Sequence, residues 1–362
     1  MKKVTFPHMG NLNIPLKAFL REMQLEIVEP PKNSKKTLDL GVKYSPEFAC
    51  LPLKYNIGNF IQALEKGANI ILMGGGVGPC RFGYYCEVQK EILRDLGYEF
   101  KMINLEPDFK QTFFRLRRLF GGIKVRQLYR GGKLAWKKVI NADRVRELVF
   151  AERAREKVKG KIDRIYESYL SSLDEITIPK KVEKITEEYI GKIRKATGEY
   201  RRGMKIRIGL VGEIYMLLEP FANLDIARKL GTLGASVERK MSLSHWLRSF
   251  LNLDDEEERI SVAAENYLET PVGGHGQMSV GKTVEYARTA DYDGVIHLSP
   301  FTCMPEIVAQ MILPEISEKE NVPVLSLIFD EHTGEAGLNT RLEAFIDMIY
   351  RNKIKEKGVV NV

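Results

Sequence analysis

Short apolar runs alternate with amphipathic stretches over roughly the first hundred residues. The runs KVTF, LEIVEP, NIILMGG and EFKMINLE predict strands, and helical spacing of apolar residues predicts helices near residues 16–23, 59–66 and 83–96. Strands that alternate with helices are typical of a parallel sheet covered by helices on its faces. The N-terminal part of the chain is therefore predicted to be an α/β domain.

The same alternation returns after residue 202. The runs MKIRIGLVG, ASVERKM, YDGVIHLS and VPVLSLIFD predict strands, with helices expected near residues 224–233, 256–268, 305–317 and 340–351. The region between contains long charged runs with apolar residues at helical spacing, which predict helices. We expect an α/β protein with parallel-sheet domains at residues 1–107 and 201–362, joined by a helical bridge at residues 108–200.

Composition agrees with a globular protein of two domains. The chain has 362 residues, of which 44% are hydrophobic and 29% charged, and this excludes extensive disorder. The N-terminal stretch is broken by His8, Asn11 and prolines before any apolar run forms, so neither a signal peptide nor a membrane span is expected. Four scattered cysteines are too few for a disulfide framework. These features predict a cytoplasmic protein without a membrane partner.

The net charge of +8 is unevenly distributed along the chain. Between Lys110 and Arg164 there are 18 Lys and Arg residues and 5 Asp and Glu residues. Such a segment can dock an acidic partner, a phosphate-bearing ligand such as a coenzyme A tail, or nucleic acid, although a solvated helical face explains it equally well. It leaves one alternative function open, a non-enzymatic binding or scaffold protein with structural metal or no metal.

Three of the four cysteines lie in Gly- or Pro-containing turns that precede a predicted helix. Cys80 and Cys303 each follow a predicted strand, and Cys50 follows a proline turn. Loops after parallel strands meet at the carboxyl edge of a sheet, where ligands bind. The helix start and the adjacent Arg81 are expected to lower the pKa of the Cys80 thiol and favour a metal-binding thiolate, while Gly78 lets the backbone approach an inorganic group.

The residues alone leave the kind of metal open. Structural zinc sites usually contain close C-x-x-C pairs, which this chain lacks, so the wide spacing favours a cluster at a domain interface. Three separate buried thiols would give the same sequence. Cys86 lies six residues after Cys80 in a predicted helix, where about 100° per residue turns it away from the direction of Cys80. It is interpreted as a core cysteine, with a fourth-ligand role as the alternative.

Four longer motifs include these cysteines and the C-terminal region. They are CLPLK at Cys50, GPCRFGYY at Cys80, SPFTCMPE at Cys303 and DEHTGEAGLNTRLEAFID at residues 330–347. Together they resemble motifs of the 2-hydroxyacyl-CoA dehydratase and benzoyl-CoA reductase superfamily, and most closely its activase-related branch, which is similar to the D component of 2-hydroxyglutaryl-CoA dehydratase. The resemblance extends over nearly the whole chain.

The resemblance implies paired Rossmann-like or flavodoxin-like domains with a 4Fe-4S cluster held between them by Cys50, Cys80 and Cys303. Its fourth iron is implied to be open or to take a non-cysteine ligand. In the dehydratases, an ATP-driven activator injects one low-potential electron, and a radical form of the CoA thioester then loses water; related proteins reduce small molecules instead. This chain has no sugar-kinase-like ATPase domain. We therefore expect a separate ATP-dependent activase or other electron donor, a CoA thioester as the substrate class, and a homo- or heterodimer.

Candidate catalytic residues follow predicted strands of the second domain. Glu213 comes after MKIRIGLVG, and Glu331 and His332 come after VPVLSLIFD. At the carboxyl edge these side chains could occupy the open iron site or move a proton. For the turn that contains Glu331 and His332, the alternative is that Thr340 and its neighbours cap the helix that follows. His297 lies within a predicted strand and is interpreted as a core histidine.

Residues 276–283, GQMSVGKT, match the Walker A pattern G-x4-G-K-T. A P-loop needs a strand before this pattern and a helix after it, but here a predicted helix and the loop NYLETPVGGH precede it. A nucleotide site is therefore not expected. Gly276 is instead predicted to lie in a glycine-rich loop near the cluster, or in one that holds a ligand phosphate through its amides.

Overall fold

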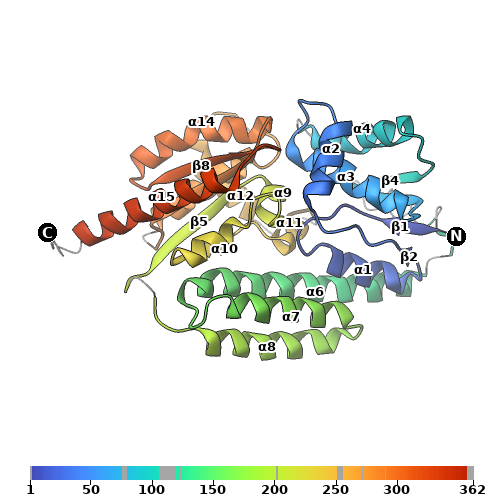
Figure 1. Cartoon of the computed structure of the whole chain (residues 1–362), viewed down its shortest axis with the longest axis horizontal. Helices are drawn as coiled ribbons and strands as arrows, with labels where there is room; N and C mark the ends of the chain where they lie inside the picture. Colours follow the sequence, from blue (N-terminus) through green and yellow to red (C-terminus); the bar gives the residue numbers. More distant parts are fainter. Residues whose placement is uncertain are drawn as a thin grey trace.

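The computed structural model describes residues 2–75, 80–105, 117, 120–122, 124–200, 203–250, 256–270, 272–289 and 291–356. Within these residues the chain forms two four-stranded sheets, and every strand pair in both sheets is parallel. The two α/β halves lie side by side above a layer of three long helices (Figure 1). The predicted α/β class with two parallel sheets and a helical region is confirmed.

The first sheet has the strand order β2-β1-β3-β4. Its strands are β1 (Lys3–Thr5), β2 (Glu26–Ile27), β3 (Ile70–Gly74) and β4 (Lys101–Leu105), and its helices are α1 (Asn13–Glu22), α2 (Lys35–Tyr44), α3 (Leu51–Glu65) and α4 (Phe82–Asp95). The sequence pattern did not predict α2, because its apolar residues Leu38, Leu40, Val42 and Tyr44 alternate with period two and do not follow helical spacing. A capping box begins it, in which the Ser34 hydroxyl accepts from the Thr37 amide and the Thr37 hydroxyl accepts from the Ser34 amide.

The second sheet has the order β6-β5-β7-β8. Its strands are β5 (Ile206–Gly212), β6 (Ala235–Glu238), β7 (Gly294–Pro300) and β8 (Val324–Phe329). The helices of this half are α9 (Ile214–Leu218), α10 (Ile226–Thr232), α11 (Leu243–Phe250), α12 (Glu256–Glu265), α13 (Gly276–Arg288), α14 (Met304–Lys319) and α15 (Glu335–Glu356). Strand β7 is buried along its whole length, as expected for a central strand covered by helices on both faces.

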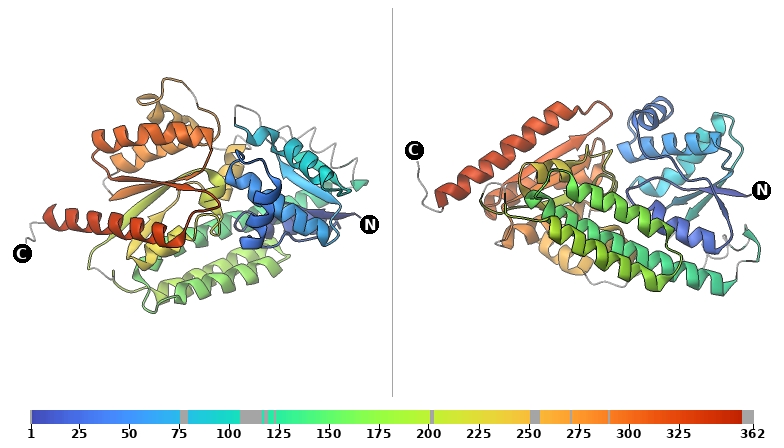
Figure 2. Two further views of the ribbon diagram at one scale, coloured as in Figure 1. Left: turned by 45° about the horizontal axis from the view of Figure 1, so that its top comes forward. Right: turned by 60° about the horizontal axis from the view of Figure 1, so that its bottom comes forward.

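The helical layer consists of α6 (Val125–Glu152), a short 3-10 helix (Arg153–Arg155), α7 (Lys161–Glu175) and α8 (Pro179–Ala196). Helix α6 packs against α1 of the first half and β6 of the second, so it bridges both (Figure 2). None of the helices in the described part of the chain is long and apolar enough to cross a membrane. The domain boundaries at residues 107 and 200 stay a prediction; the first sheet ends at Leu105 and the second begins at Ile206.

Several cations of the basic segment are used inside this helical layer. Lys138 is buried, which lowers its pKa to about 8, and its ammonium donates to the Asp174 carbonyl. Arg153 forms an ion pair with Asp163, and Arg144 with Glu187. Residues 106–116, 118, 119 and 123 of the segment lie outside the described residues. Lys138, Arg144 and Arg153 thus have a structural role in holding the three helices together.

A buried carboxylate joins the two halves. Glu219, 2% exposed, accepts hydrogen bonds from His8 Nδ1 at 3.0 Å and from the Gly10 amide at 2.7 Å, in the loop that follows β1. Nearby, the Tyr215 hydroxyl donates to the His8 carbonyl at 3.2 Å. Burial alone would raise the pKa of Glu219, but the bonds from His8 and backbone amides hold it below its ordinary value. Glu219 is therefore ionised at neutral pH and links the two carboxyl edges.

Replacement of Glu219 by Gln should destabilise the fold at pH 7 by about 1–3 kcal/mol, because charge-assisted hydrogen bonds between the halves are weakened. The folded-state pKa of Glu219 is depressed, so its contribution is present above the ordinary value of 4.5 and is lost as the pH falls below it. Urea unfolding between pH 7 and pH 3 should show the wild type and Glu219→Gln converging in acid. A constant difference at every pH would contradict this, and the exposed Glu335→Gln is the matched control.

Candidate cysteine site between the two sheets

Each of the three loop cysteines lies at the start of a helix. Cys50 is the N-cap of α3, and Cys303 is the N-cap of α14. Both helices have a proline in their first turn, where a missing amide hydrogen costs nothing. Cys80 lies two residues before α4. Cys50 and Cys80 come from the first half of the molecule and Cys303 from the second.

Arg81 ties the three cysteine loops together. Its guanidinium donates to the Phe48 carbonyl at 3.0 Å and also to the Thr302 carbonyl. The Thr302 hydroxyl donates to the same Phe48 carbonyl at 3.0 Å. One side chain next to Cys80 therefore holds the residues just before Cys50 and Cys303, across a sequence separation of 221 residues. The planar guanidinium suits this role, because it can donate in two directions at once.

A glycine turn lies directly against Cys80. Gly274 has a φ of +65°, which favours glycine, and a Cβ atom there would lie 2.9 Å from Pro305 Cγ and 3.6 Å from Cys80 Cβ. A Cβ atom on Gly276 would lie 2.3 Å from the Pro305 carbonyl oxygen. The turn therefore fits between the Cys80 loop and the first turn of α14. Gly276 begins helix α13, so the predicted glycine-rich loop is wrong, and its place beside a cluster stays a prediction.

The Walker A match has a structural explanation. All of residues 276–283 lie in α13, so their amides are not arranged around a phosphate as in a P-loop. Lys282 is 2% exposed and Thr283 is fully buried, with its hydroxyl donating to the Ser279 carbonyl at 2.7 Å. The pattern marks a buried helix that packs against α12 and α14.

Burial governs the thiols of this site. Burial is the largest cause of the pKa shift of each thiol. It raises the pKa of Cys50 to about 11, and it also raises the pKa values of Cys80 and Cys303. The negative charge of Glu213 raises all three further, whereas Arg81 lowers those of Cys50 and Cys80. The expected net lowering at Cys80 is therefore wrong, because desolvation and a carboxylate outweigh the helix start and Arg81. A cation that binds here must displace protons.

Glu213 is the catalytic candidate that the structure brings to the cysteines. It is the N-cap of α9, where its carboxylate accepts from the Met216 amide at 3.0 Å. Burial, together with the charge of Glu306, raises its pKa to about 7. Its charge also acts on the Tyr85 hydroxyl, which is hydrogen-bonded to Cys50 Sγ. This carboxyl group can hold or release a proton near neutral pH beside the three thiols.

Glu331 and His332 are held differently. Glu331 forms an ion pair with the buried Lys54 at 2.7 Å; burial raises its pKa, but the bond from Lys54 outweighs this and leaves it lowered. His332 is exposed, and its amide donates to Asp330 in a tight turn. The predicted capping by Thr340 is wrong, because α15 already begins at Glu335. Neither Glu331 nor His332 is among the groups whose charge shifts the thiol pKa values.

The sequence pattern missed Glu306, which lies in the first turn of α14. It is fully buried, and its Oε2 atom is 2.8 Å from His297 Nε2 and accepts from the Ser279 hydroxyl at 2.8 Å. Its Oε1 atom has no hydrogen-bond partner in the described part of the structure. His297 is fully buried and close to Ser326 as well, as expected of a core histidine. An acidic residue three positions after Cys303 was the available signal for this buried pair.

The remaining site predictions concern Cys86 and Gly78. Cys86 is 2% exposed and packs in the core between α3 and α4, in a cluster with Leu53 and Ile57. Its interpretation as a core cysteine, and that of the other three as ligands, stay predictions. Gly78 lies outside the described residues. All four cysteines are free of disulfide bonds.

Cysteine sulfurs are the donor type that iron-sulfur clusters use. No three His, Cys, Asp or Glu side chains within the described ranges gather closely enough to hold one metal ion. A cluster binds each thiolate at a different iron, so it requires three thiols around a shared space and not around a point. Cys50, Cys80 and Cys303 lie at helix starts on both sides of the interface, and their ligation of a cluster stays a prediction.

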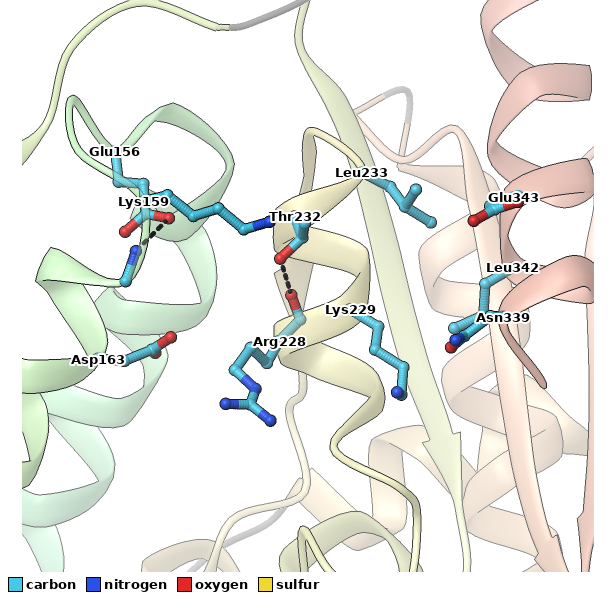
Figure 3. A pocket seen from close by; sticks show the side chains of 11 residues that line it. Glu156, Lys159, Asp163, Arg228, Lys229, Thr232, Leu233, Asn339, Leu342 and Glu343 are labelled. Carbon is cyan, nitrogen blue, oxygen red and sulfur yellow. Dashed lines mark hydrogen bonds between the residues drawn. The ribbon is translucent and has the colours of Figure 1, made fainter. Parts of the chain in front are cut away.

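A separate hollow of about 340 Å³ lies between α7, α10 and α15 (Figure 3). Its cations Lys159, Arg228 and Lys229 lie among the carboxylates of Glu156, Asp163 and Glu343, as the close view shows. The Glu156 carboxylate already accepts from the Gly160 amide at the start of α7. No cysteine loop lines this hollow, so it is not part of the site.

The fold and site define an α/β protein with a cysteine site between two parallel sheets. Residues 149–349, more than half of the chain, match the family described as 2-hydroxyglutaryl-CoA dehydratase, D-component. The chain belongs to this family, and the predicted resemblance is confirmed. The match includes Glu213 and Cys303, whereas Cys50 and Cys80 lie before it. No curated protein matches the chain.

Replacement of Arg81 by Lys should loosen the cysteine loops, because lysine keeps the charge but cannot donate to the Phe48 and Thr302 carbonyls together. In metal-free, reduced protein, alkylation of Cys50, Cys80 and Cys303 should become about fivefold faster, equivalent to about 1 kcal/mol of easier local opening. Mass spectrometry of iodoacetamide-treated protein measures this at each cysteine. Buried Cys86 is the internal reference, and Arg94→Lys on the same helix is the control. Equal rates in both variants would contradict the bridging role.

Proposed function

We propose that this protein is the cluster-bearing component of a system related to the 2-hydroxyacyl-CoA dehydratases. Cys50, Cys80 and Cys303 hold a 4Fe-4S cluster, and a separate ATP-dependent activase or another donor supplies its electron. The observation that carries the proposal is the bridge made by Arg81, which brings three cysteine-bearing helix starts from both halves together. Family membership supports the same reading, with a CoA thioester as the substrate class.

The surroundings of the thiols support low-potential chemistry. When bound, the cluster supplies a one-electron donor to a substrate that is then dehydrated or reduced. The carboxylates of Glu213 and Glu306 place negative charge near the thiols, and negative charge lowers a reduction potential. The Tyr85 hydroxyl, whose pKa is raised by burial and by the Cys50 charge, stays protonated and can donate to the Cys50 sulfur, which by itself raises the potential and opposes the two carboxylates.

Glu213 is the residue proposed to handle a proton. Its pKa of about 7 allows both protonation states at neutral pH, and its charge acts on every one of the three thiols. It can therefore accept or deliver a proton beside the cluster, or provide a carboxylate to the iron that the cysteines leave open. Glu331 is less suited to either role, because Lys54 holds it as a paired carboxylate.

A non-enzymatic scaffold that uses the basic segment has less support. Lys138, Arg144 and Arg153 of that segment are used in contacts within the helical layer. These three cations therefore contribute to the packing of α6 to α8. Nucleic acid is not a partner under this proposal.

Anaerobic reconstitution with iron and sulfide should give a brown protein with absorbance near 400 nm that is lost in air. The single variants Cys50→Ala, Cys80→Ala and Cys303→Ala should each retain less than about a tenth of the iron and sulfide, because each removes one of three thiolates. Cys86→Ala is the matched control and should keep the full content. Metal and sulfide analysis with EPR provides the measurement. A colourless protein with stoichiometric zinc, or a loss confined to Cys86→Ala, would overturn the proposal.

Replacement of Glu213 by Gln should raise the reduction potential of the reconstituted protein, because it removes a negative charge near the thiols. A shift of about 60 mV, a tenfold change for one electron, is expected above pH 7. As the pH falls below about 7 the wild-type carboxyl becomes neutral, so the difference should shrink. An EPR-monitored redox titration at several pH values tests this. Glu331→Gln should shift the potential less, because Lys54 already balances that charge; the reverse order would contradict the assignment.

A further inference from the structure

A second cleft opens at the carboxyl edge of the same sheet that carries Cys303. Arg239 and Lys240 directly follow β6, which ends at Glu238. They line a cleft of about 550 Å³ together with α6 and α8 of the helical layer. Its charged lining residues are Arg144, Glu147, Arg194, Glu238, Arg239 and Lys240. The carboxyl edge of a parallel sheet is where this kind of fold binds ligands, and the volume suits a small molecule.

Arg239 is a buried cation with no carboxylate within ion-pair distance among the described residues, although the charges of Asp143 and Glu147 act on it. It is 2% exposed, and one of its guanidinium nitrogens donates to the Leu217 carbonyl. Its Nε atom is buried without any hydrogen-bond partner within the described ranges. Burial lowers its pKa to about 10, and the positive charge of the neighbouring Arg146 contributes. A desolvated guanidinium with an unused donor is costly unless an anion accepts from it.

The rest of the cleft is positive on balance. Arg194 is exposed on α8, and no carboxylate lies within ion-pair distance of it among the described residues. Arg144 forms an ion pair with Glu187, and Lys240 forms one with Glu285 at 3.5 Å. Of the two acids in the lining, Glu238 pairs with Arg207. Burial and the nearby Asp143 raise the pKa of the other, Glu147, whereas the charges of Arg239 and Arg146 lower it.

We propose that this cleft binds the phosphate group of a small phosphorylated molecule, with Arg239 and Arg194 as its main contacts. A phosphate has several acceptor oxygens and a double negative charge, and guanidinium groups match that geometry through paired hydrogen bonds. Leu148, Ala151, Ile190 and Val237 also line the cleft and provide apolar surface for the remainder of the molecule. The site shares no lining residue with the cysteine loops and does not depend on the cluster.

Calorimetric titration of the full-length protein with AMP, ADP and inorganic phosphate tests this site. Binding with a Kd of about 1 mM or tighter is expected for at least one of these probes, and it should weaken as the salt concentration rises. Tighter binding of the nucleotides than of inorganic phosphate would assign the ligand as a phosphorylated organic molecule. Equal or tighter binding of inorganic phosphate would assign the site to the free anion. No binding of any probe at 50 mM salt, where ion pairs are screened less than at physiological salt, would overturn the proposal.

Two variants identify the contacts. Arg194→Gln changes an exposed position and should weaken binding about tenfold. Arg239→Gln should weaken binding to the same extent, and its circular dichroism spectrum must match that of the wild type for the comparison to count. Lys184→Gln removes a charge from an exposed position elsewhere on α8 and should leave the affinity unchanged. Equal effects of Arg194→Gln and Lys184→Gln would show a diffuse charge effect and overturn the site.

Discussion

The cysteine site depends on one constraint, that the carboxyl edges of two parallel sheets face each other and stay fixed. Glu219 enforces this constraint, because it lies in the second half but accepts hydrogen bonds from His8 and Gly10 of the first. Packing reinforces it, since Tyr55 of α3 stacks on Tyr215 of α9 with ring centroids 5.8 Å apart. Helix α3 begins at Cys50, so the same contacts that join the halves also fix one of the three thiols.

The electrostatics of the site follow from this arrangement. Facing edges bring helix starts, which favour anions, to partly or fully buried positions. Burial then keeps the Cys50, Cys80 and Cys303 thiols neutral, and Glu213 adds to the effect. A neutral, buried set of sulfur donors avoids the cost of several uncompensated negative charges in the free protein. The thiolate form becomes favourable when a positively charged centre is present to compensate it.

The sequence predicted the parts of this structure that depend on local pattern. Alternating strands and helices gave both sheets, and the turns at Cys80 and Cys303 were visible because each follows an apolar strand and precedes a helix. Helix α2 was missed, because its apolar residues do not follow helical spacing. The sequence sign of this helix is the capping box at its start. The GQMSVGKT segment looked like a loop because of its glycines, yet Gly276 is required by contact with Pro305, which no local pattern contains. Arg81 was recognised for its charge, whereas its main role is to hold Phe48 and Thr302, which only the tertiary structure reveals.

Helix α6 limits how the molecule can move. It is a continuous helix of 28 residues, about 42 Å long, that packs against α1 at one end and β6 at the other. A hinge motion that parted the halves would have to bend or break this rod, besides separating the pair formed by His8 and Glu219. Entry to the thiols is therefore a matter of short loop displacements near the exposed Phe48 and Arg81, and not of domain opening. Under the proposed function, assembly of the metal centre is a local event at the surface of an otherwise rigid body.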